Sequence, residues 1–367
     1  MKKKILFILH LPPPVHGASM VGEYVRSSRL VNENYECRFI NLGTAFSLGE
    51  IGKVSLGKLS AFAALYKKVC KSLKDFKPDL VYVTASSTGL GFMKDSLLVG
   101  MIKRKGFPVV VHFHNKGVSM NHSCILKKRY TRFFDNVSVI MLSGRLYSDI
   151  AEYVPRERVS FCPNGVDDPG VLPKYRHEVP HILFLSNLIE SKGLLVLLDA
   201  CVLLKERGVP FVLDIAGGET AEISAERLFS ETESRGLTEM VCYHGSVAGE
   251  KKDSMYLNAD IFTLPSYNDC FPLVVLEAMA HSLPVVSTDE GAIPDIVEDG
   301  VTGFVIERRN PEALSKALEM LLCNCDKGHE MGKRGREEYE RSYTINSFEN
   351  RFVSILNELC SDSPVRF

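Results

Sequence analysis

The stretch from Leu264 to Ala280, with the sequence LPSYNDCFPLVVLEAMA, decides both the fold and the candidate site of this protein. It follows directly on a short apolar run at 261–264, which is typical of a strand buried on both faces of a parallel sheet. A turn comes next, and Pro272 opens an apolar helix because proline is favoured at the first helical position. Asp269 and Glu277 are eight positions apart. The first therefore lies in the loop and the second about two turns into the helix.

Short apolar runs with room for one helix between them recur along the chain, which predicts an α/β protein with parallel sheets. The predicted strands are 3–9, 37–42, 80–85, 109–114, 137–142 and 159–163 in the first half, and 181–186, 211–216, 240–244, 261–264, 283–287 and 303–306 in the second. A chain of 367 residues is long enough for two domains. Turn residues cluster at 163–169, so we place the boundary near residue 170. The last predicted helix, from about Ile345, has an apolar face that must dock on another element, formed by Phe348, Phe352, Ile355, Leu356 and Leu359.

Hydropathy and cysteine content indicate a reducing compartment. The apolar run at 5–9 is too short for a signal peptide, and no other stretch is long enough to span a bilayer. We therefore expect a cytoplasmic protein. The ten cysteines include no C-x-x-C pair and mostly lie inside apolar runs. This pattern predicts reduced core residues and no structural zinc site.

Charge is distributed unevenly between the two halves. Residues 1–165 contain 25 Lys and Arg against 11 Asp and Glu, which leaves 19 against 34 for the rest, so the halves carry +14 and −15. The basic clusters at 103–105 and 127–129 fit a membrane surface or a phosphorylated acceptor. A solvated basic face attracted to the acidic domain explains them equally well. We expect no nucleic-acid partner, and peripheral contact with the inner face of the membrane is one hypothesis.

The second half contains residues suited to a diphosphate. Lys192 lies at the start of a predicted helix, where its ammonium can neutralise phosphate charge. Leu273 and Val274 contribute first-turn N–H groups that can bind phosphate oxygens. Glu277 lies on an apolar helix and needs a partner to offset its burial. Ribose hydroxyls would satisfy it, and a capping or salt-bridge role is the structural alternative.

The first half has a glycine turn and a histidine pair. Gly17 lies between the first strand and a helix beginning near Ala18, where free N–H groups can bind phosphate. The turn lacks the G-x-G-x-x-G spacing, which argues against a dehydrogenase. His112 and His114 end the fourth strand and share a face. They are either polar site residues or hydrogen-bonded structural histidines, and no nearby carboxylate or cysteine completes a metal shell.

The quoted stretch, continued through 283–288, 291–300 and 302–304, resembles the retaining GT-B glycosyltransferases of family 4 (glycosyl transferases group 1). The segments 164–166, 192–193 and 216–218 extend the resemblance over nearly the whole second half, and Gly17 and Phe113-His114 carry a looser one in the first. The resemblance implies two Rossmann-like domains whose parallel sheets face each other across a cleft. Residues 1–170, with a C-terminal helix at about 345–362 crossing back, would bind the acceptor. Residues 171–344 would bind the nucleotide sugar.

The resemblance also assigns roles. The implied catalytic residues are His114, beside the anomeric carbon, and Asp269, on the hydroxyls of the donor sugar. Lys192 would hold the diphosphate, Glu277 the ribose, and Gly17 would close over the phosphates. The full set of implied donor-binding residues is Gly17, Asn187, Lys192, Leu273, Val274 and Glu277.

The implied reaction transfers a hexosyl or N-acetylhexosaminyl group, with retention of configuration, from a nucleotide diphosphate sugar to a saccharide or lipid-linked acceptor in bacterial surface polysaccharide biosynthesis. UDP is favoured over GDP. No D-x-D carboxylate pair is present, so we expect neither a metal ion nor another cofactor. Asp269 and Asn187 stand where the family usually has Glu and Arg, which leaves Lys192 and helix dipoles to stabilise the diphosphate. A nucleotide-sugar 2-epimerase and a catalytically degenerate donor-binding subunit are the alternatives.

Overall fold

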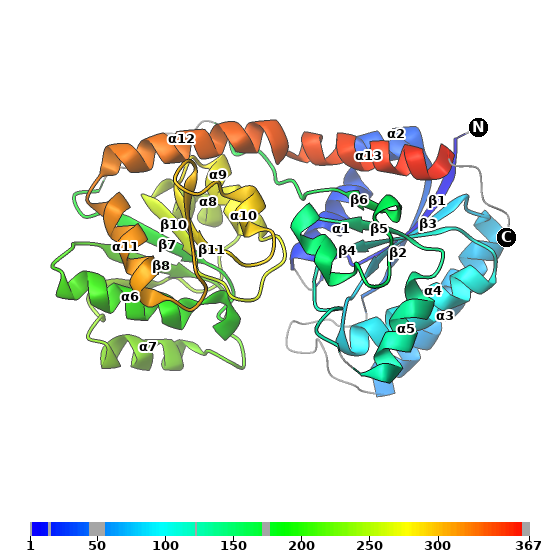
Figure 1. The fold of residues 1–367 in the computed structure, drawn as a ribbon, viewed down its shortest axis with the longest axis horizontal. Coiled ribbons are helices and arrows are strands. Elements are labelled where there is room, and N and C mark those ends of the chain that lie inside the picture. Colours follow the sequence, from blue (N-terminus) through cyan, green and yellow to red (C-terminus); the bar gives the residue numbers. More distant parts are fainter. Residues whose placement is uncertain (1, 14–15, 44–55, 122, 171–176, 362–367) are drawn as a thin grey trace. The chain divides into compact units, whose positions relative to one another are not determined.

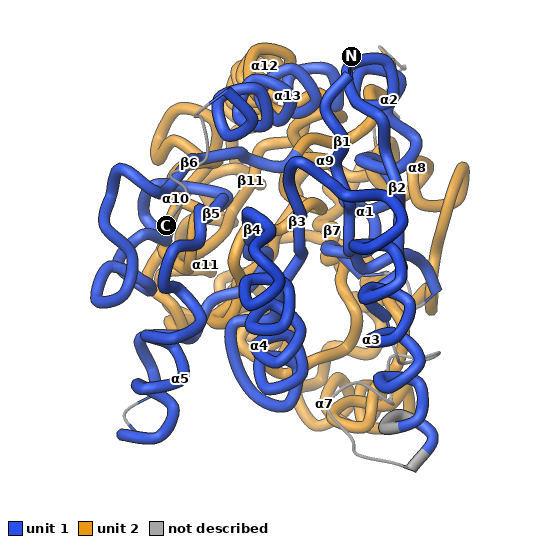
Figure 2. The backbone as a smooth tube through the Cα atoms, turned by 90° about the vertical axis from the view of Figure 1, so that its right-hand side faces the viewer, with its two compact units in different colours: residues 1–164, 345–367 blue, residues 165–344 orange. Residues whose placement is uncertain are grey.

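The computed structural model describes residues 2–13, 16–43, 56–121, 123–170 and 177–361 (Figure 1). Pro14 and Val15 of the Gly17 turn, and residues 171–176 just after the predicted boundary, lie outside these ranges. The chain divides into two compact units (Figure 2): unit 1 comprises residues 1–164 and 345–367, and unit 2 comprises residues 165–344. None of the described helices is long and apolar enough to cross a membrane.

Unit 1 is built on a six-stranded parallel sheet in the order β2-β1-β3-β4-β5-β6. Its strands are β1 (Lys4–Leu9), β2 (Glu36–Asn41), β3 (Leu80–Ala85), β4 (Val109–Phe113), β5 (Ser138–Met141) and β6 (Val159–Phe161). β1 and β3 are buried along nearly their whole length, as the continuous apolar runs predict for strands covered on both faces. In register, Ile8 of β1 lies between Ile40 of β2 and Val83 of β3. At the neighbouring position along β1, Phe7 lies between Phe39 of β2 and Tyr82 of β3, so the centre of the sheet is formed by aliphatic and aromatic side chains.

The helices of unit 1 cover the sheet in two layers. The connections β2–β3, β3–β4 and β4–β5 all run in one direction across the sheet, so right-handed crossovers place α3 (Leu56–Phe76), α4 (Gly89–Arg104) and α5 (Cys124–Phe134) on the same face. α3 contacts α4, and α4 contacts α5. The β1–β2 connection runs the other way and contains α1 (Gly17–Ser27) and α2 (Arg29–Asn34). The described segment between β5 and β6 contains two 3₁₀ helices, η2 (Gly144–Asp149) and η3 (Arg156–Arg158).

The last helix, α13 (Ile345–Ser361), belongs to unit 1 although it follows unit 2 in the chain. It contacts α2, and Tyr35 donates its hydroxyl proton to Asn357 Oδ1 at 2.7 Å. Phe352 is fully buried, and its ring centroid lies 5.3 Å from that of Tyr82 on β3. Phe348, Ile355 and Leu356 are also buried, whereas Leu359 is only half-buried. The apolar face predicted for this helix is thus used to cover the sheet of unit 1.

Unit 2 repeats the arrangement with a parallel sheet in the order β12-β11-β10-β7-β8-β9. Its strands are β7 (His181–Leu185), β8 (Val212–Ala216), β9 (Val241–Tyr243), β10 (Ile261–Leu264), β11 (Val285–Thr288) and β12 (Gly303–Ile306). Its helices are η4 (Glu190–Lys192), α6 (Leu194–Glu206), α7 (Ala225–Ser234), α8 (Glu250–Leu257), α9 (Leu273–Ala280), α10 (Ile293–Ile296), α11 (Pro311–Leu322) and α12 (Cys325–Ser342). The predicted alternation of strands and helices in two parallel sheets is confirmed.

Candidate donor site and histidine cluster

In unit 2 the loop after β7 and the loop after β10 are joined by hydrogen bonds. The carbonyl oxygen of Ser191 accepts from the backbone N–H of Tyr267 at 2.9 Å and from the hydroxyl of Ser266 at 3.0 Å. Gly193 allows this approach because it has a φ of +85°, and a Cβ there would lie 2.0 Å from the carbonyl oxygen of Pro265. The two loops therefore form one edge, at the carboxyl ends of β7 and β10, where open α/β sheets bind their ligands.

Lys192 and Asp269, two of the predicted site residues, form an ion pair on this edge. Lys192 Nζ lies 2.6 Å from Asp269 Oδ2, and the two side chains are 22% and 12% exposed. The backbone N–H of Asp269 donates to Glu290 Oε1 at 3.2 Å, and Arg308 Nη1 donates to Glu290 Oε2 at 2.7 Å. Glu290, which sequence reasoning missed, is 1% exposed. A buried, arginine-paired carboxylate thus fixes the loop that presents Asp269.

The N-terminus of α9 follows immediately. Pro272 is the N-cap residue, and no side chain caps the helix. Leu273 and Val274 are half-buried. Since the first N–H groups of a helix have no partner within the helix, these amides are suited to an anion. They follow Asp269 closely in the chain, so Lys192 and the helix terminus present positive charge to the same region.

The structure gives Glu277 two partners within the protein. Lys252 Nζ donates to its Oε1 at 2.7 Å, and Tyr256 donates its hydroxyl proton to Oε2 at 2.8 Å; both partners lie on α8. Burial, reinforced by the carboxylate of Glu277, raises the pKa of Tyr256 well above its usual value, so it remains a donor. The salt bridge given above as the structural alternative for Glu277 is therefore present, and a contact with ribose hydroxyls stays a prediction. Lys252 and Tyr256 went unpredicted because nothing in the composition of α8 marks them.

Asn187 is also used within the protein. Its Oδ1 accepts from the backbone N–H of Gly218 at 3.2 Å, which ties the loop after β7 to the loop after β8. In this structure the side chain joins two loops of the site edge. An arginine has no acceptor, so it could not make this contact.

In unit 1 the predicted histidine pair lies at the end of β4. The rings of His112 and His114 have centroids 4.2 Å apart, so the prediction that they share a face is confirmed. His112 Nδ1 is 2.7 Å from the hydroxyl of Tyr82, whereas its Nε2 is buried with no partner among the described residues. Burial lowers the pKa of His114 to about 3, with His16 adding to the shift, and lowers the pKa of His112 as well. Both imidazoles are therefore neutral near pH 7.

His10 and His16, which were not predicted, join this cluster. His16 is the N-cap residue of α1, and its Nδ1 accepts from the N–H of Ser19 at 3.3 Å. In the neutral ring that acceptor role places the proton on Nε2. Burial lowers the pKa of His16, and it lowers the pKa of His10 to about 3 with help from Lys94 and the neighbouring histidines. Gly17 is exposed, and a Cβ there would meet nothing within 4 Å. The α1 terminus therefore has open space beside neutral hydrogen-bonding groups.

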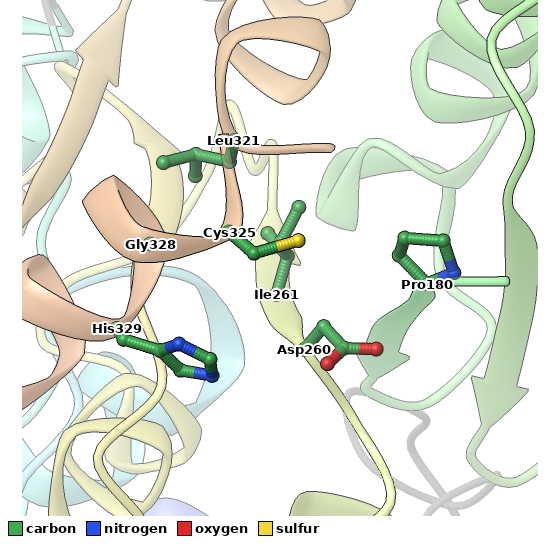
Figure 3. Close-up of a pocket in the computed structure, with 7 residues that line it drawn as sticks. All are labelled: Pro180, Asp260, Ile261, Leu321, Cys325, Gly328 and His329. Carbon is green, nitrogen blue, oxygen red and sulfur yellow. The ribbon is translucent and has the colours of Figure 1, made fainter. Parts of the chain in front are cut away.

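Within the described ranges, no group of three or more His, Cys, Asp or Glu residues is arranged to hold a metal ion. A small pocket in unit 2 (Figure 3) is lined by Pro180, Asp260, Ile261, Leu321, Cys325, Gly328 and His329. Asp260 and Ile261 lie at the amino end of β10, the edge of the sheet opposite Lys192 and Asp269. This pocket is therefore not part of the candidate donor site.

Comparison with known proteins finds sequence similarity mainly in the second unit. Residues 173–338 match the family model of the glycosyl transferases group 1. The amylovoran biosynthesis glycosyltransferase AmsK of Erwinia amylovora is 30% identical over 234 residues, covering 60% of this chain and 55% of that protein. The putative colanic acid biosynthesis glycosyltransferase WcaL of Escherichia coli K12 is 31% identical over 215 residues, covering 56% and 52%. The chain thus spans about half the length of the curated relatives it matches.

Solved structures match over nearly the full chain. Sucrose-phosphate synthase from Thermosynechococcus elongatus superposes with a TM-score of 0.79 at 18% identity, covering 99% of this chain and 100% of that one. Anabaena HepE in complex with UDP gives a TM-score of 0.72 at 18% identity, covering 98% and 100%. At such identities the likeness concerns the fold. Together these findings show that residues 173–338 resemble the glycosyl transferases group 1, and that the chain shares the fold of these solved structures.

Proposed function

We propose that the chain transfers a sugar from a nucleotide diphosphate sugar, with UDP as the first choice of nucleotide, to a saccharide or lipid-linked acceptor with retention of configuration. The observation that carries this proposal is the pairing of Lys192 with Asp269 beside the uncapped N-terminus of α9. A diphosphate bound there would receive the ammonium of Lys192 and the amides of Leu273 and Val274. Asp269 would turn from Lys192 to the hydroxyls of the sugar.

Relatives of this chain support the choice of substrate. AmsK and WcaL are named for the biosynthesis of amylovoran and colanic acid, and HepE has been solved with UDP and with UDP-glucose. We extend this chemistry to the present chain and place it in bacterial surface polysaccharide biosynthesis. The leaving diphosphate gains negative charge as the bond to the sugar breaks. We propose that Lys192 and the α9 terminus stabilise that charge with no divalent metal.

In unit 1 we propose that His114 contacts the reacting sugar and that the α1 terminus at Gly17 receives phosphate oxygens. A neutral His114 can donate one hydrogen bond through one ring nitrogen and accept one at the other, and it places no charge beside an oxocarbenium-like centre.

Thermal unfolding with a panel of nucleotides tests the donor site. A ligand at one hundred times its Kd adds about 2.7 kcal/mol to stability, which is readily measured. We expect UDP and UDP-sugars to raise the Tm, and we expect Lys192→Ala and Glu277→Ala to remove the shift. Lys251→Ala, an exposed lysine on α8, is the matched control and should keep it. A folded protein whose Tm no nucleotide changes would contradict the proposal.

Product analysis separates the alternatives. Slow hydrolysis of a UDP-sugar that persists in EDTA supports a metal-independent transferase and excludes a subunit that only binds the donor. Reversible formation of an epimeric UDP-sugar would instead indicate a 2-epimerase.

A further inference from the structure

The outer surfaces of α3, α4 and α5 carry exposed lysines and arginines that have no ion-pair partner. They are Lys67, Lys68, Lys71 and Lys74 on α3, Arg104 and Lys105 at the end of α4, and Lys128 and Arg132 on α5. Among the described residues, none of these eight side chains enters an ion pair. Exposed acidic residues nearby include Asp75 and Asp79 at and after the end of α3, Asp135 after α5, and Glu152, which pairs with Lys127. This layer therefore retains most of its positive charge at its surface.

The clusters noted in the sequence contribute only in part. Lys103 is mostly buried, and its ammonium donates to the carbonyl oxygen of Arg132 at 2.8 Å. Lys127 pairs with Glu152 at 3.2 Å. Arg129 donates to Ser96 Oγ at 2.9 Å. These three side chains stabilise unit 1 itself, so the charge available to a partner lies mainly on α3 and on the outer line of α5.

Exposed apolar side chains lie beside the basic ones. Leu90 and Leu97 on α4 are 50% and 48% exposed, and Met120, in the turn before α5, and Ile125, in the first turn of α5, are each 76% exposed. On α4, Leu90, Leu97 and Arg104 are seven positions apart and so lie on one line. On α5, Ile125, Lys128 and Arg132 form a similar line. In both helices the apolar residues come first and the basic residues follow.

This order places the two kinds of side chain at different heights on the layer. Helices of a parallel α/β sheet run antiparallel to the strands, so the N-termini of α3, α4 and α5 lie at the carboxyl edge of the sheet, the edge that bears His114. The apolar residues Leu90, Met120 and Ile125 consequently rim that edge. The basic residues form a band farther from it.

The exposure of Met120 is built into the structure. The carboxylate of Asp149 on η2 accepts hydrogen bonds from the backbone N–H groups of Gly117, Val118 and Ser119 at 2.8, 3.1 and 2.9 Å. Asn121 Nδ2 donates to the carbonyl oxygen of Gly117 at 2.8 Å. These bonds fix the residues before Met120 and the residue after it. The backbone of the turn is therefore held in the conformation in which the Met120 side chain is exposed to solvent.

We propose that the outer face of α3, α4 and α5 docks on an anionic phospholipid surface, with Leu90, Met120 and Ile125 entering the interface and the basic band contacting the phosphate headgroups. Charge complementarity carries the choice of occupant, since basic side chains attract an anionic bilayer while exposed aliphatic side chains gain from contact with acyl chains. Docking in this orientation brings the edge that bears His114 to the lipid. Docking itself does not depend on the proposed function. Its purpose does, because a lipid-linked acceptor would then have a short path to the edge that bears His114.

The test is flotation of the full chain with vesicles of phosphatidylcholine alone and of phosphatidylcholine mixed with phosphatidylglycerol, at low and high salt. We expect binding to the mixed vesicles that weakens with salt. The quadruple variant Lys67→Gln, Lys68→Gln, Lys71→Gln and Lys74→Gln should lower the partition coefficient at least about 100-fold. The double variant Met120→Ser and Ile125→Ser should lower it at least about tenfold.

A matched control replaces an exposed aromatic and exposed lysines of unit 2 with Phe229→Ser, Lys251→Gln and Lys333→Gln. It should bind vesicles like the unmodified chain. Absence of binding to the mixed vesicles, or equal loss in the control and in the unit 1 variants, would overturn the proposal. The nucleotide-induced Tm shift, measured on the same proteins, shows whether they are folded and whether the donor site works. Failure of the docking surface and failure of the proposed function are thereby distinguished.

Discussion

At the scale of single residues, the candidate donor site is a set of charges that neutralise one another. Lys192 pairs with Asp269, and Glu277 pairs with Lys252 and accepts a hydrogen bond from the neutral Tyr256. An incoming diphosphate must compete with Asp269 for the ammonium of Lys192. The carboxylate of Asp269 therefore acts in two opposing ways, because it lowers the affinity for phosphate while remaining available to a sugar hydroxyl.

Asp269→Asn separates these two effects. Removal of the negative charge should raise the affinity for UDP roughly tenfold, because Lys192 is then attracted to the diphosphate alone. Sugar transfer should fall at least about 100-fold if the carboxylate contacts the reacting sugar. Calorimetric titration and turnover of the same preparation check both parts. Asp199→Asn, which removes a carboxylate paired with Arg235 just after α7, is the control and should change neither. Unchanged UDP affinity in Asp269→Asn would contradict competition for Lys192.

Tyr256→Phe tests the support of Glu277. Loss of the hydroxyl removes one hydrogen bond and should lower the free energy of unfolding by about 1 kcal/mol and weaken UDP binding roughly five-fold. Tyr147→Phe in unit 1 removes a comparable hydroxyl, which donates to the carbonyl oxygen of Val154 at 2.9 Å. It should lower stability to a similar degree and leave UDP binding unchanged. Equal UDP affinities in the two variants would show that Tyr256 has only a structural role.

At the scale of elements, the site depends on how closely the loops after β7 and β10 approach. Gly193→Ala should lower the free energy of unfolding by at least about 3 kcal/mol, since it combines an unfavourable positive φ with a collision against the carbonyl oxygen of Pro265. Gly208 has a similar φ of +72° and open space around it, so Gly208→Ala should cost only about 1 kcal/mol. Urea unfolding of both variants measures the difference. Equal losses of unfolding free energy in the two variants would show that only the positive φ matters, and that the close approach of Gly193 to Pro265 adds no cost.

Elements and site differ in how far the sequence could predict them. Runs such as Ile261–Leu264 predicted the strands because burial on both faces requires continuous apolar residues. Lys192 was predicted as a site residue because it lies at the start of a predicted helix, and Asp269 because it lies in a loop eight positions before Glu277, in a stretch that carries the family resemblance. Lys252 and Tyr256 on α8 contact Glu277 on α9 only in the folded structure. They lie 25 and 21 residues before Glu277 in the sequence, and contacts at such separations produce no recognisable local sequence pattern. His16 was missed as a cap because Ser, Thr, Asp and Asn usually fill that position.

At the scale of the whole molecule, the neutral histidines make stability depend on pH. The folded chain holds the pKa of His10 and of His114 near 3, far below the usual 6.5. Between these values the unfolded chain binds protons that the folded chain excludes, so stability rises with pH through this window and is lost as the pH falls below 6.5. Each histidine contributes a slope of up to about 1.4 kcal/mol per pH unit.

His10→Phe should therefore reduce the slope of the unfolding free energy against pH by the contribution of one histidine, up to about 1.4 kcal/mol per pH unit. Denaturant unfolding at several values below 6.5 measures the slope. His329→Phe, at an exposed position of α12, is the control for loss of a histidine and should leave it unchanged. A slope in His10→Phe equal to that of the unmodified chain would mean that His10 is protonated in the folded state.

The assignment of α13 to unit 1 has a consequence for synthesis on the ribosome. Residues 345–361 are translated after the whole of unit 2, yet they supply Phe352, which packs on Tyr82 and beside His112. A nascent chain can complete unit 2 while the first sheet still lacks this cover. Tyr82 and His112 then stay exposed to water until the last helix has been translated. The histidine cluster is therefore among the last parts of the molecule to reach its folded structure.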